Sequence, residues 1–400
     1  MRRLFRTPPF PTVFAVGFFQ EIAFFLLVNL PGRLQQLGFT EAGIGVAYSV
    51  SALAALLLRP LLGRVLDVFH RRTVLRVAGI LNITAIAVLA LVDVAGPVLW
   101  AAFLAQRVLQ ILLFTTILTY AADCVPQDIR TLGIAVFGMS GLIPIALANL
   151  MGDALLNELG YQGLLTAAGA VALVSWSLVW RLPLLPVLGS RPRRNFWAVV
   201  RQPDLMPVWW ISLMFAMAME TIFVFMRPFI DARQVGSLGL FFVVYGTLAI
   251  LTRLIGGRLT ALPARRIIVA AMGGMAAGMA VLGAAFSLPL LLGAAALLGG
   301  SHGVIFPIIS AQVVDRARTS ERGTAVATFT SVFDLGLIVC APIVGAVIER
   351  FDYGLAFGAV GLTVAGGTLV FAAWDRRLEA HLAAADRAPA PLGISDRPDR

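Results

Sequence analysis

The 400-residue chain contains no lysine, so every one of its 31 Lys or Arg residues is an arginine. A Walker A loop needs a lysine on the nucleotide phosphates, and a Schiff-base enzyme needs an amine, so the sequence excludes both. The three histidines, at positions 70, 302 and 381, lack the spacing of metal ligands, and we expect no metal site and no cofactor. No nucleophile constellation is present either, and we expect no enzyme. Energy for any pumping must come from an ion gradient or from a partner chain.

Charge is also scarce. Charged residues make up 13% of the chain and hydrophobic residues 59%, against roughly 25% and ~45–50% in soluble domains. This composition is typical of a membrane protein. The two cysteines, Cys124 and Cys340, lie in or beside apolar stretches, and we interpret them as packing residues rather than a disulfide. The net charge of +10 comes without an aromatic and basic platform, which argues against nucleic acid as a partner.

Hydropathy predicts an all-α integral membrane protein with about twelve transmembrane helices, six in each half. The spans lie near residues 11–30, 41–62, 73–92, 97–122, 132–152, 160–180, 205–228, 236–257, 267–287, 288–314, 324–348 and 353–374. Four prolines in residues 182–203 prevent a continuous helix there. The predicted organisation is an N-terminal six-helix half (1–181), a cytoplasmic linker (182–203), a C-terminal six-helix half (204–375) and a disordered cytoplasmic tail (376–400).

The arginines are distributed unevenly between the loops on the two sides. Alternating the spans places nearly all of them on one side, including Arg2, Arg3 and Arg6. The positive-inside rule then places both termini and the linker in the cytoplasm. The first span is too long for a signal-peptide core and no small-residue cleavage site follows it, so we expect no cleaved signal. The expected location is the inner membrane of a bacterium.

The second half of the chain repeats features of the first. The segment Arg59-Pro-Leu-Leu-Gly-Arg64 returns 194 residues later as Arg253-Leu-Ile-Gly-Gly-Arg258, and the pair Arg71-Arg72 returns as Arg265-Arg266. A duplicated half of this length in an apolar chain predicts a transporter built from two parallel repeats, with the substrate path between them.

The loop after the second span carries the most specific motif. Gly63, Asp67 and the pair Arg71-Arg72 allow a tight cytoplasmic turn, in which the carboxylate can meet a facing helix N-terminus or arginine. This segment resembles the signature between the second and third helices of the major facilitator superfamily, although it differs at two positions. Val68 replaces the usual basic residue and His70 the usual glycine, and in the second half Ala261 replaces the aspartate. The resemblance implies a cytoplasmic gate, for which we predict Gly63, Asp67, Arg71, Arg72 and Arg130.

The fourth span contains an arginine that also resembles the family pattern, in Arg107-Val-Leu-Gln110, with Ile111 in place of the usual glycine. Arg107 lies ten residues past Pro97, about 15 Å into the span. Exposure of a guanidinium to lipid at this depth costs at least ~2.5–3.5 kcal/mol, so it must face a cavity or a carboxylate. His302 lies at the repeat position of Gln110. We therefore expect Arg107, Gln110 and His302 around a central substrate cavity.

Three acidic residues lie inside predicted spans and are candidates for proton coupling. Glu21 occupies the first span, Glu220 a similar place in the seventh, and Asp334 the middle of the eleventh. Buried carboxylates at such positions are suited to take up and release protons. Each of them is equally consistent with a structural role in hydrogen bonding between helices. Glu21 is the first candidate, because Gln20 is beside it and Arg107 is within possible reach.

These features predict a secondary active transporter working by alternating access, with proton-coupled export of a small, partly hydrophobic compound as the leading function. The fifth span lacks the Gly-Pro pair of the family's antiporters, which weakens the case for export. Proton-driven uptake of a polar or anionic metabolite is the alternative if Arg107 binds an anion. A membrane scaffold or sensor that transports nothing is the alternative from another class. The expected partners are the substrate, protons and the lipid bilayer, and the expected state is a monomer.

Overall fold

The structure is a computed structural model, and it describes residues 9–125, 133, 136–185, 196–256, 262–318 and 321–387. Within these residues the secondary structure consists of helices joined by short turns, with no strand. Eleven of the described helical segments are long and apolar enough to cross a membrane. The all-helical membrane fold that hydropathy predicts is therefore confirmed.

The described part of the N-terminal half consists mainly of long helices. They are α2 (Phe10–Leu26), which continues through the 3₁₀ turn η1 (Leu27–Asn29) into α3 (Leu30–Gln36), then α4 (Glu41–Val68), α5 (Arg71–Leu91), α6 (Pro97–Cys124) and α8 (Met139–Val179). The α-helical ladder of the first span is interrupted before Pro31, which lacks the backbone N–H that a helix interior needs. Thr40 begins α4 by accepting a hydrogen bond from the Gly43 amide at 3.2 Å.

Helix α8 contains two of the twelve predicted spans. Its direction changes at Gly160, where φ is 65° and ψ is −172°, a conformation open to glycine but strained for other residues. Ser175 donates a hydrogen bond to the Val16 carbonyl, and Ser140 lies beside the adjacent Gly17. Residues 140 and 175 would be roughly 50 Å apart in a straight helix, so the chain must reverse between them. The eleven long helical segments therefore provide twelve crossings.

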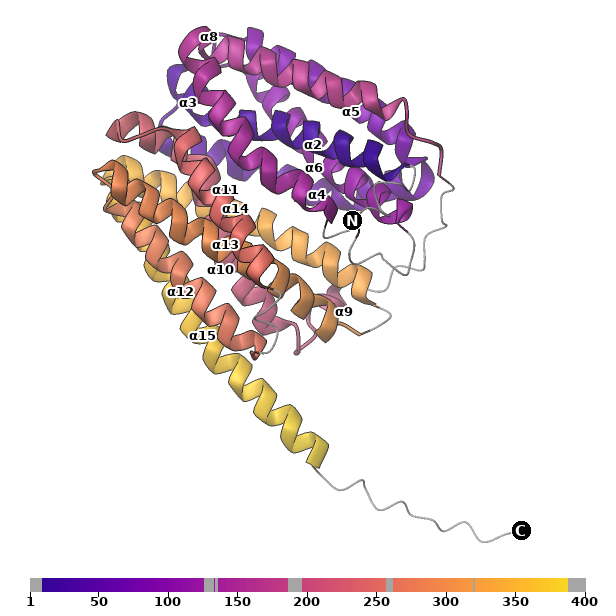
Figure 1. The fold of residues 1–400 in the computed structure, drawn as a ribbon, viewed down its shortest axis with the longest axis vertical. Coiled ribbons are helices and arrows are strands. Elements are labelled where there is room, and N and C mark those ends of the chain that lie inside the picture. Colours follow the sequence, from indigo (N-terminus) through magenta and orange to yellow (C-terminus); the bar gives the residue numbers. More distant parts are fainter. Residues whose placement is uncertain are drawn as a thin grey trace.

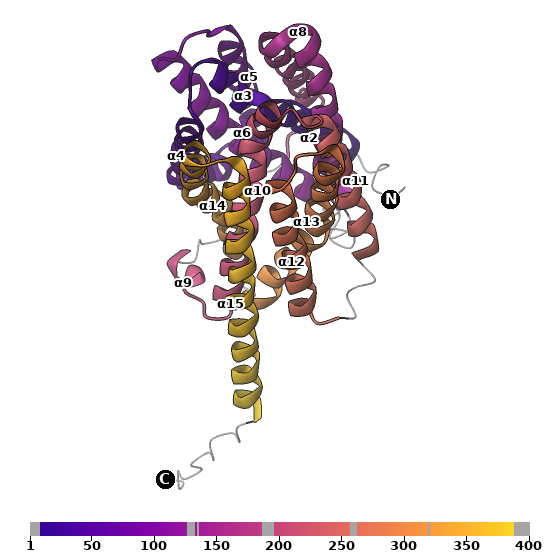
Figure 2. The same ribbon diagram turned by 90° about the vertical axis from the view of Figure 1, so that its left-hand side faces the viewer.

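The C-terminal half follows the short helix α9 (Phe196–Val200) in the linker. Its helices are α10 (Met206–Arg233), α11 (Leu238–Gly256), α12 (Ala264–Gly283), α13 (Leu288–Arg316), α14 (Arg322–Arg350) and α15 (Tyr353–Arg387). The composition predicts a disordered tail from residue 376, but α15 continues to Arg387 and extends beyond the other helices (Figure 2). The segment is rich in the helix formers Ala, Leu, Glu and Arg, and the first proline after it is Pro389.

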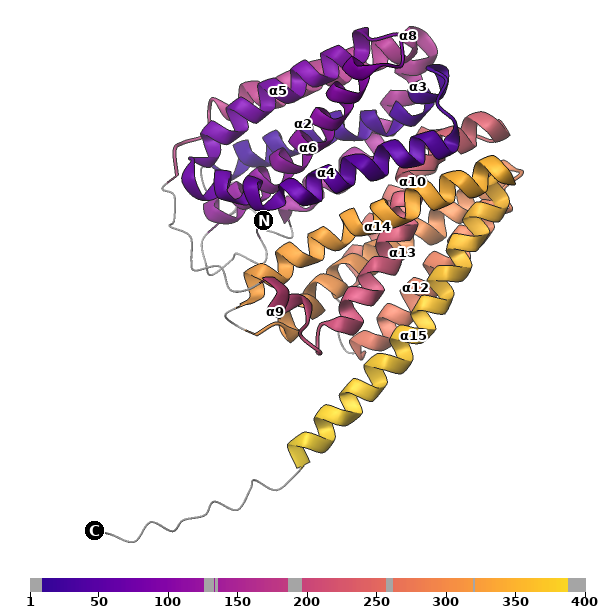
Figure 3. The same cartoon turned by 180° about the vertical axis from the view of Figure 1, so that it is seen from behind.

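The two halves form separate bundles that meet along α4 with α14 and α8 with α11. One end of the molecule carries α9 and the turn between α4 and α5, and we call it the linker end. The opposite end, here the far end, carries the α3–α4 turn and the bend of α8. The ribbons of the two halves converge at the far end and diverge towards the linker end (Figures 1 and 3).

Large apolar side chains cover much of the outer surface. Leu57, Leu362 and Leu369 are each more than 70% exposed, and many other leucines, valines and isoleucines are at least one-third exposed. A soluble protein rarely exposes apolar area on this scale. Lipid chains supply the missing contacts in a bilayer, so the exposed pattern fits the membrane-spanning fold.

Glycine allows close helix packing within the C-terminal half, and this predicts the effect of one substitution. A Cβ added at Gly299 of α13 would lie 2.1 Å from the Tyr245 carbonyl oxygen of α11. Gly299→Ala is expected to destabilise the protein by about 1–3 kcal/mol, since backbone must move to relieve the overlap. The measurement is the melting temperature in detergent. Gly358→Ala is the control, because its Cβ would meet no atom within 4 Å; an equal loss in both variants would contradict the packing argument.

Candidate functional site

The interface between α4 and α14 is closely packed towards the far end. A Cβ at Gly45 would lie 2.2 Å from the Ala341 carbonyl oxygen, and one at Gly345 would lie 2.4 Å from the Glu41 carbonyl oxygen. The Ser49 hydroxyl donates a hydrogen bond to the Ile338 carbonyl at 2.9 Å. Backbones this close leave no room for side chains between them, so the halves are in direct contact here.

Nearer the linker end of the same interface, Arg59 of α4 donates hydrogen bonds to three groups of α14. Its Nε donates to Asp334 Oδ2 at 2.7 Å, and its two terminal nitrogens donate to the Thr330 hydroxyl at 2.9 Å and to the Thr330 carbonyl at 3.1 Å. Arg59 lies about 14 Å, and Asp334 about 18 Å, from the linker ends of their helices. A charge-assisted bond at this depth holds the two halves together well inside the membrane. Asp334, predicted from sequence as a proton-coupling candidate, is thus an ion-pair partner of the other half.

The far end carries a second cross-half ion pair, between α8 and the C-terminal half. Arg227 of α10 donates to Asp231 at 2.5 and 2.9 Å and to Asp153 of α8 at 3.4 Å. Asp153 also accepts a hydrogen bond from the Gly239 amide at 2.6 Å. Because Gly239 lies in the first turn of α11, the carboxylate of one half caps a helix of the other.

A third polar contact closes the far end between α4 and the start of α15. Tyr353 donates to Glu41 at 3.0 Å, and Gln35 donates to the same carboxylate oxygen at 3.0 Å. The Ala42 amide donates to Glu349 at 3.3 Å. Together with the Asp153 contacts, these bonds join the halves at the far end through carboxylates on both sides.

Between the far end and the linker end lies a group of charged and aromatic residues contributed by both halves. The guanidinium of Arg107 in α6 lies 5.1 Å from the ring centroid of Tyr48 in α4. It also interacts electrostatically with the carboxylates of Glu220 in α10 and Asp334 in α14. Glu220 is half-buried, and within the described residues it forms no hydrogen bond or ion pair of its own. We call Arg107, Tyr48, Glu220, Asp334 and Arg59 the cross-half cluster.

Glu21 lies in a different environment. Its side chain is only 9% exposed, and it has no hydrogen-bond or ion-pair partner among the residues that the structure describes. The neighbouring Gln20 donates to Gln110 at 2.8 Å, which joins α2 to α6 inside the N-terminal half. The electrostatic partners of Arg107 are Glu220 and Asp334 rather than Glu21. The electrostatic interactions of Arg107 thus reach the other half, and no contact between Glu21 and Arg107 is present among the described residues.

His302 packs inside the C-terminal half. Its Nδ1 is 2.6 Å from the Tyr245 hydroxyl, and its ring lies 5.5 Å from Phe215 and 6.1 Å from Phe306. Among the described residues, no hydrogen bond or ring contact joins His302, Gln110 and Arg107 to one another. The structure brings Arg107 to the cross-half cluster, places Gln110 against Gln20, and encloses His302 in aromatic rings.

The structure describes three of the five predicted gate residues in full. Gly63 lies in α4, while Arg71 and Arg72 begin α5. Arg71 Nε is 3.1 Å from Asp123, and Arg72 donates to the Trp180 carbonyl at 2.7 Å, so both are bound within the N-terminal half. Asp67 lies in α4, but its side chain is outside the described part, as is all of Arg130.

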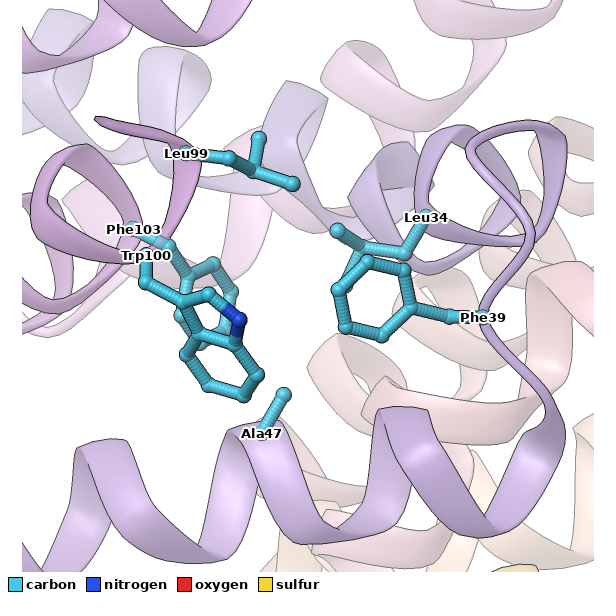
Figure 4. A pocket seen from close by; sticks show the side chains of 6 residues that line it. All are labelled: Leu34, Phe39, Ala47, Leu99, Trp100 and Phe103. Carbon is cyan, nitrogen blue, oxygen red and sulfur yellow. The ribbon is translucent and has the colours of Figure 1, made fainter. Parts of the chain in front are cut away.

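A small pocket at the far end is lined by six apolar side chains: Leu34, Phe39, Ala47, Leu99, Trp100 and Phe103 (Figure 4). Substrate sites need a few polar groups to orient the ligand, and this lining exposes none. We therefore assign the pocket to packing. No group of three or more possible metal ligands is found among the described residues.

Comparisons with known proteins agree with this architecture. The sequence profile described as Major Facilitator Superfamily matches residues 10–261 and 208–394, and the chain belongs to that superfamily. It is 25% identical to uncharacterised MFS-type transporters of Burkholderia mallei (strain SAVP1) and Burkholderia pseudomallei (strain K96243), over 85% of this chain and 85% of each relative. The resemblance deduced from the loop motif is confirmed.

Solved structures show the same fold. A POT family transporter in complex with a thioalcohol-conjugated peptide has a TM-score of 0.79 at 10% identity, covering 92% of this chain and 96% of its own. The nucleoside transporter NupG has 0.72 at 16%, covering 91% and 98%. The human organic anion transporter MFSD10 (TETRAN) has 0.67 at 19%, covering 92% and 99%. The protein is a multi-pass membrane transporter of the secondary type.

The ion pair across the interface predicts a specific coupling. Arg59→Gln and Asp334→Asn should each lower the melting temperature in detergent, and the double variant should lose less than the sum. The expected coupling is about 0.5–3 kcal/mol, because the residues share one network. Arg33 and Asp93 form the control pair: Asp93 is 73% exposed and should couple by less than about 1 kcal/mol. Strictly additive effects at 59 and 334 would show that the pair does not hold the halves.

Proposed function

We propose that the protein couples proton movement to export of a small, partly hydrophobic compound by alternating access. The proposed state of this structure is closed at the far end and open at the linker end. The hydrogen bonds of Glu41 and Asp153 support closure at the far end, and the diverging halves support opening at the other (Figure 1). Rocking of the halves would break the far-end bonds and form new contacts at the linker end.

The observation that carries the proposal is the electrostatic interaction between Arg107 and Glu220, one residue from each half. A carboxylate that faces an arginine across the interface is attracted to it only while ionised. Proton binding at Glu220 removes that attraction, so the proton changes the free-energy difference between the two arrangements of the halves. Glu220 is therefore the proposed proton carrier, with Glu21 second as a buried carboxyl group without a partner.

Aromatic side chains near Glu220 support a substrate with an apolar part. Phe25 of the N-terminal half and Phe223 of the C-terminal half approach across the interface with ring centroids 6.0 Å apart. Phe223 also stacks on Phe242 at 5.8 Å. The proposed substrate places its apolar part against these rings and its polar part towards Arg107 and Glu220.

Uptake of an anionic metabolite is the second candidate function. In the described part of the chain Arg107 forms no ion pair within contact distance, and its guanidinium contacts the Tyr48 ring. A free guanidinium of this kind is suited to a carboxylate or phosphate group. The human organic anion transporter MFSD10, which has the same fold, supports this alternative.

The proposed location is the bacterial inner membrane, with the linker end in the cytoplasm. The arginine-rich loops and α9 lie at this end, as the positive-inside rule requires. Each chain contains both halves of the transport path, and we propose that it acts as a monomer.

Replacement of the proposed proton carrier gives the decisive test. A compound panel first identifies a substrate by its accumulation in cells with and without the protein. In proteoliposomes, Glu220→Gln should abolish transport driven by an imposed pH gradient, while substrate exchange without a gradient continues, because only the protonation step is lost. The control is Glu158→Gln, an exposed acid near the bend of α8, which should keep wild-type gradient-driven transport.

Two results would contradict the proposal in different ways. Full gradient-driven transport by Glu220→Gln, with loss in Glu21→Gln, would move proton coupling to Glu21. Substrate movement from outside to inside, together with the proton, would replace export by uptake.

A further inference from the structure

Two arginines and two tryptophans form a cradle on the outer side of the N-terminal half, at the linker end. The Arg76 guanidinium carbon lies 3.7 Å from the ring centroid of Trp180, and Arg72 donates to the Trp180 carbonyl at 2.7 Å. Trp176 Nε1 donates to the Arg76 carbonyl at 2.8 Å. These contacts hold the first two turns of α5 against the last turn of α8. We call Arg72, Arg76, Trp176 and Trp180 the arginine–tryptophan cradle.

Within the described residues, no carboxylate forms an ion pair with the two arginines of the cradle. Asp123 pairs with Arg71 instead. The Nε atoms of both arginines are buried and have no hydrogen-bond partner in this part of the chain. Arg181, also basic, follows Trp180 and is exposed. Two adjacent, partly exposed guanidiniums without an ion-pair partner among the described residues favour a bound anion with several acceptor oxygens.

An apolar surface continues from the cradle towards the membrane centre. Ile80 lies one turn after Arg76 in α5 and is 42% exposed, and its neighbour Leu81 is 50% exposed. On α8, Leu173 lies two turns before Trp180 and is 47% exposed. In a bilayer this surface meets acyl chains, while Arg76, about 8 Å into α5, lies near the headgroups.

We infer that the cradle binds an anionic phospholipid of the leaflet at the linker end. The lipid phosphate accepts hydrogen bonds from Arg72 and Arg76, and one acyl chain lies along Ile80, Leu81 and Leu173. Tryptophan is typical of the membrane interface, and basic pockets between transmembrane helices are suited to acidic headgroups. An anionic headgroup is preferred over a zwitterionic one, because the zwitterionic ammonium would face uncompensated arginines. This site is separate from the cross-half cluster and does not depend on the proposed substrate or coupling ion.

The other half provides a natural contrast. Arg265 and Arg266 stand 194 residues after Arg71 and Arg72, and Arg265 pairs with Glu379 at 2.5 Å, as Arg71 pairs with Asp123. Ala270 occupies the position that corresponds to Arg76. The repeat therefore preserves the paired arginines of the loop without the second guanidinium of the cradle, and the site is expected in the N-terminal half alone.

Native mass spectrometry of the full-length, delipidated protein tests the inference with two probes, phosphatidylglycerol and phosphatidylcholine of identical chains. The wild type should bind one phosphatidylglycerol in preference to phosphatidylcholine. Arg72→Gln with Arg76→Gln should weaken phosphatidylglycerol binding roughly thirty-fold, about 2 kcal/mol for two arginines at a membrane surface. The matched control, Arg265→Gln with Arg266→Gln, should bind as the wild type does. Replacement of Arg72 and Arg76 by lysine should restore most binding, because the charge returns.

A second measurement locates the lipid on the cradle. Phosphatidylglycerol with brominated chains should quench tryptophan fluorescence more than the phosphatidylcholine equivalent, and Trp180→Phe should remove that difference. Equal binding of the two lipids by the wild type, or unchanged binding by the double glutamine variant, would overturn the inference. Displacement by millimolar inorganic phosphate would assign the cradle to a free anion and would equally overturn the lipid site.

Discussion

A charge inside the membrane needs an opposite charge or an aromatic face, and this requirement determines how the two halves meet. Arg59 satisfies it with Asp334 across the interface, whereas Arg227 binds Asp231 of its own half at 2.5 and 2.9 Å and Asp153 of the other half at 3.4 Å. Arg107 satisfies it with the Tyr48 ring and with acidic groups from the other half. Because exposure of these guanidiniums to lipid would cost several kcal/mol, the halves cannot separate at the interface without new partners. The contacts that stabilise one arrangement are thus the ones that a conformational change must replace.

The two interfaces use this requirement differently, although the halves are repeats. Arg253 corresponds to Arg59, but its guanidinium lies 5.9 Å from the Phe306 ring inside its own half. At the α8–α11 interface the directional contact is the hydrogen bond from the Gly239 amide to Asp153, and a Cβ at Gly246 would lie 3.3 Å from Ala146. Small residues permit close approach without a directional bond. Both interfaces combine close packing at glycines with a directional bond, which is an ion pair between α4 and α14 and a bond from a backbone amide to a carboxylate between α8 and α11.

The sequence predicts the spans well, because hydropathy and prolines act locally, and the motif around Gly63 identifies the superfamily. The helical extension to Arg387 was missed because a charged, alanine-rich segment suits both a solvated tail and a helix. The cross-half pairs depend on how each helix is rotated and on which helices meet. For this reason the sequence identifies Arg59 only as a repeated motif residue, and it favours Glu21 over Glu220 as the proton carrier. The signal for Arg59 was present, since an arginine inside an apolar span needs a partner.

The distribution of ion pairs along the membrane normal fits the proposed motion of the two halves relative to each other. In the described part of the chain, the ion pairs at the linker end stay within one half: Arg71 with Asp123, and Arg316 with Asp375 at 2.6 Å. Those pairs tie neighbouring helices of each half together, and among the described residues no ion pair joins the two halves at this end. At the far end the carboxylates of Glu41 and Asp153 instead reach across. The proposed rocking breaks these shared contacts at the far end. The cross-half cluster lies between the two ends, so the same motion changes the distance from Arg107 to Glu220.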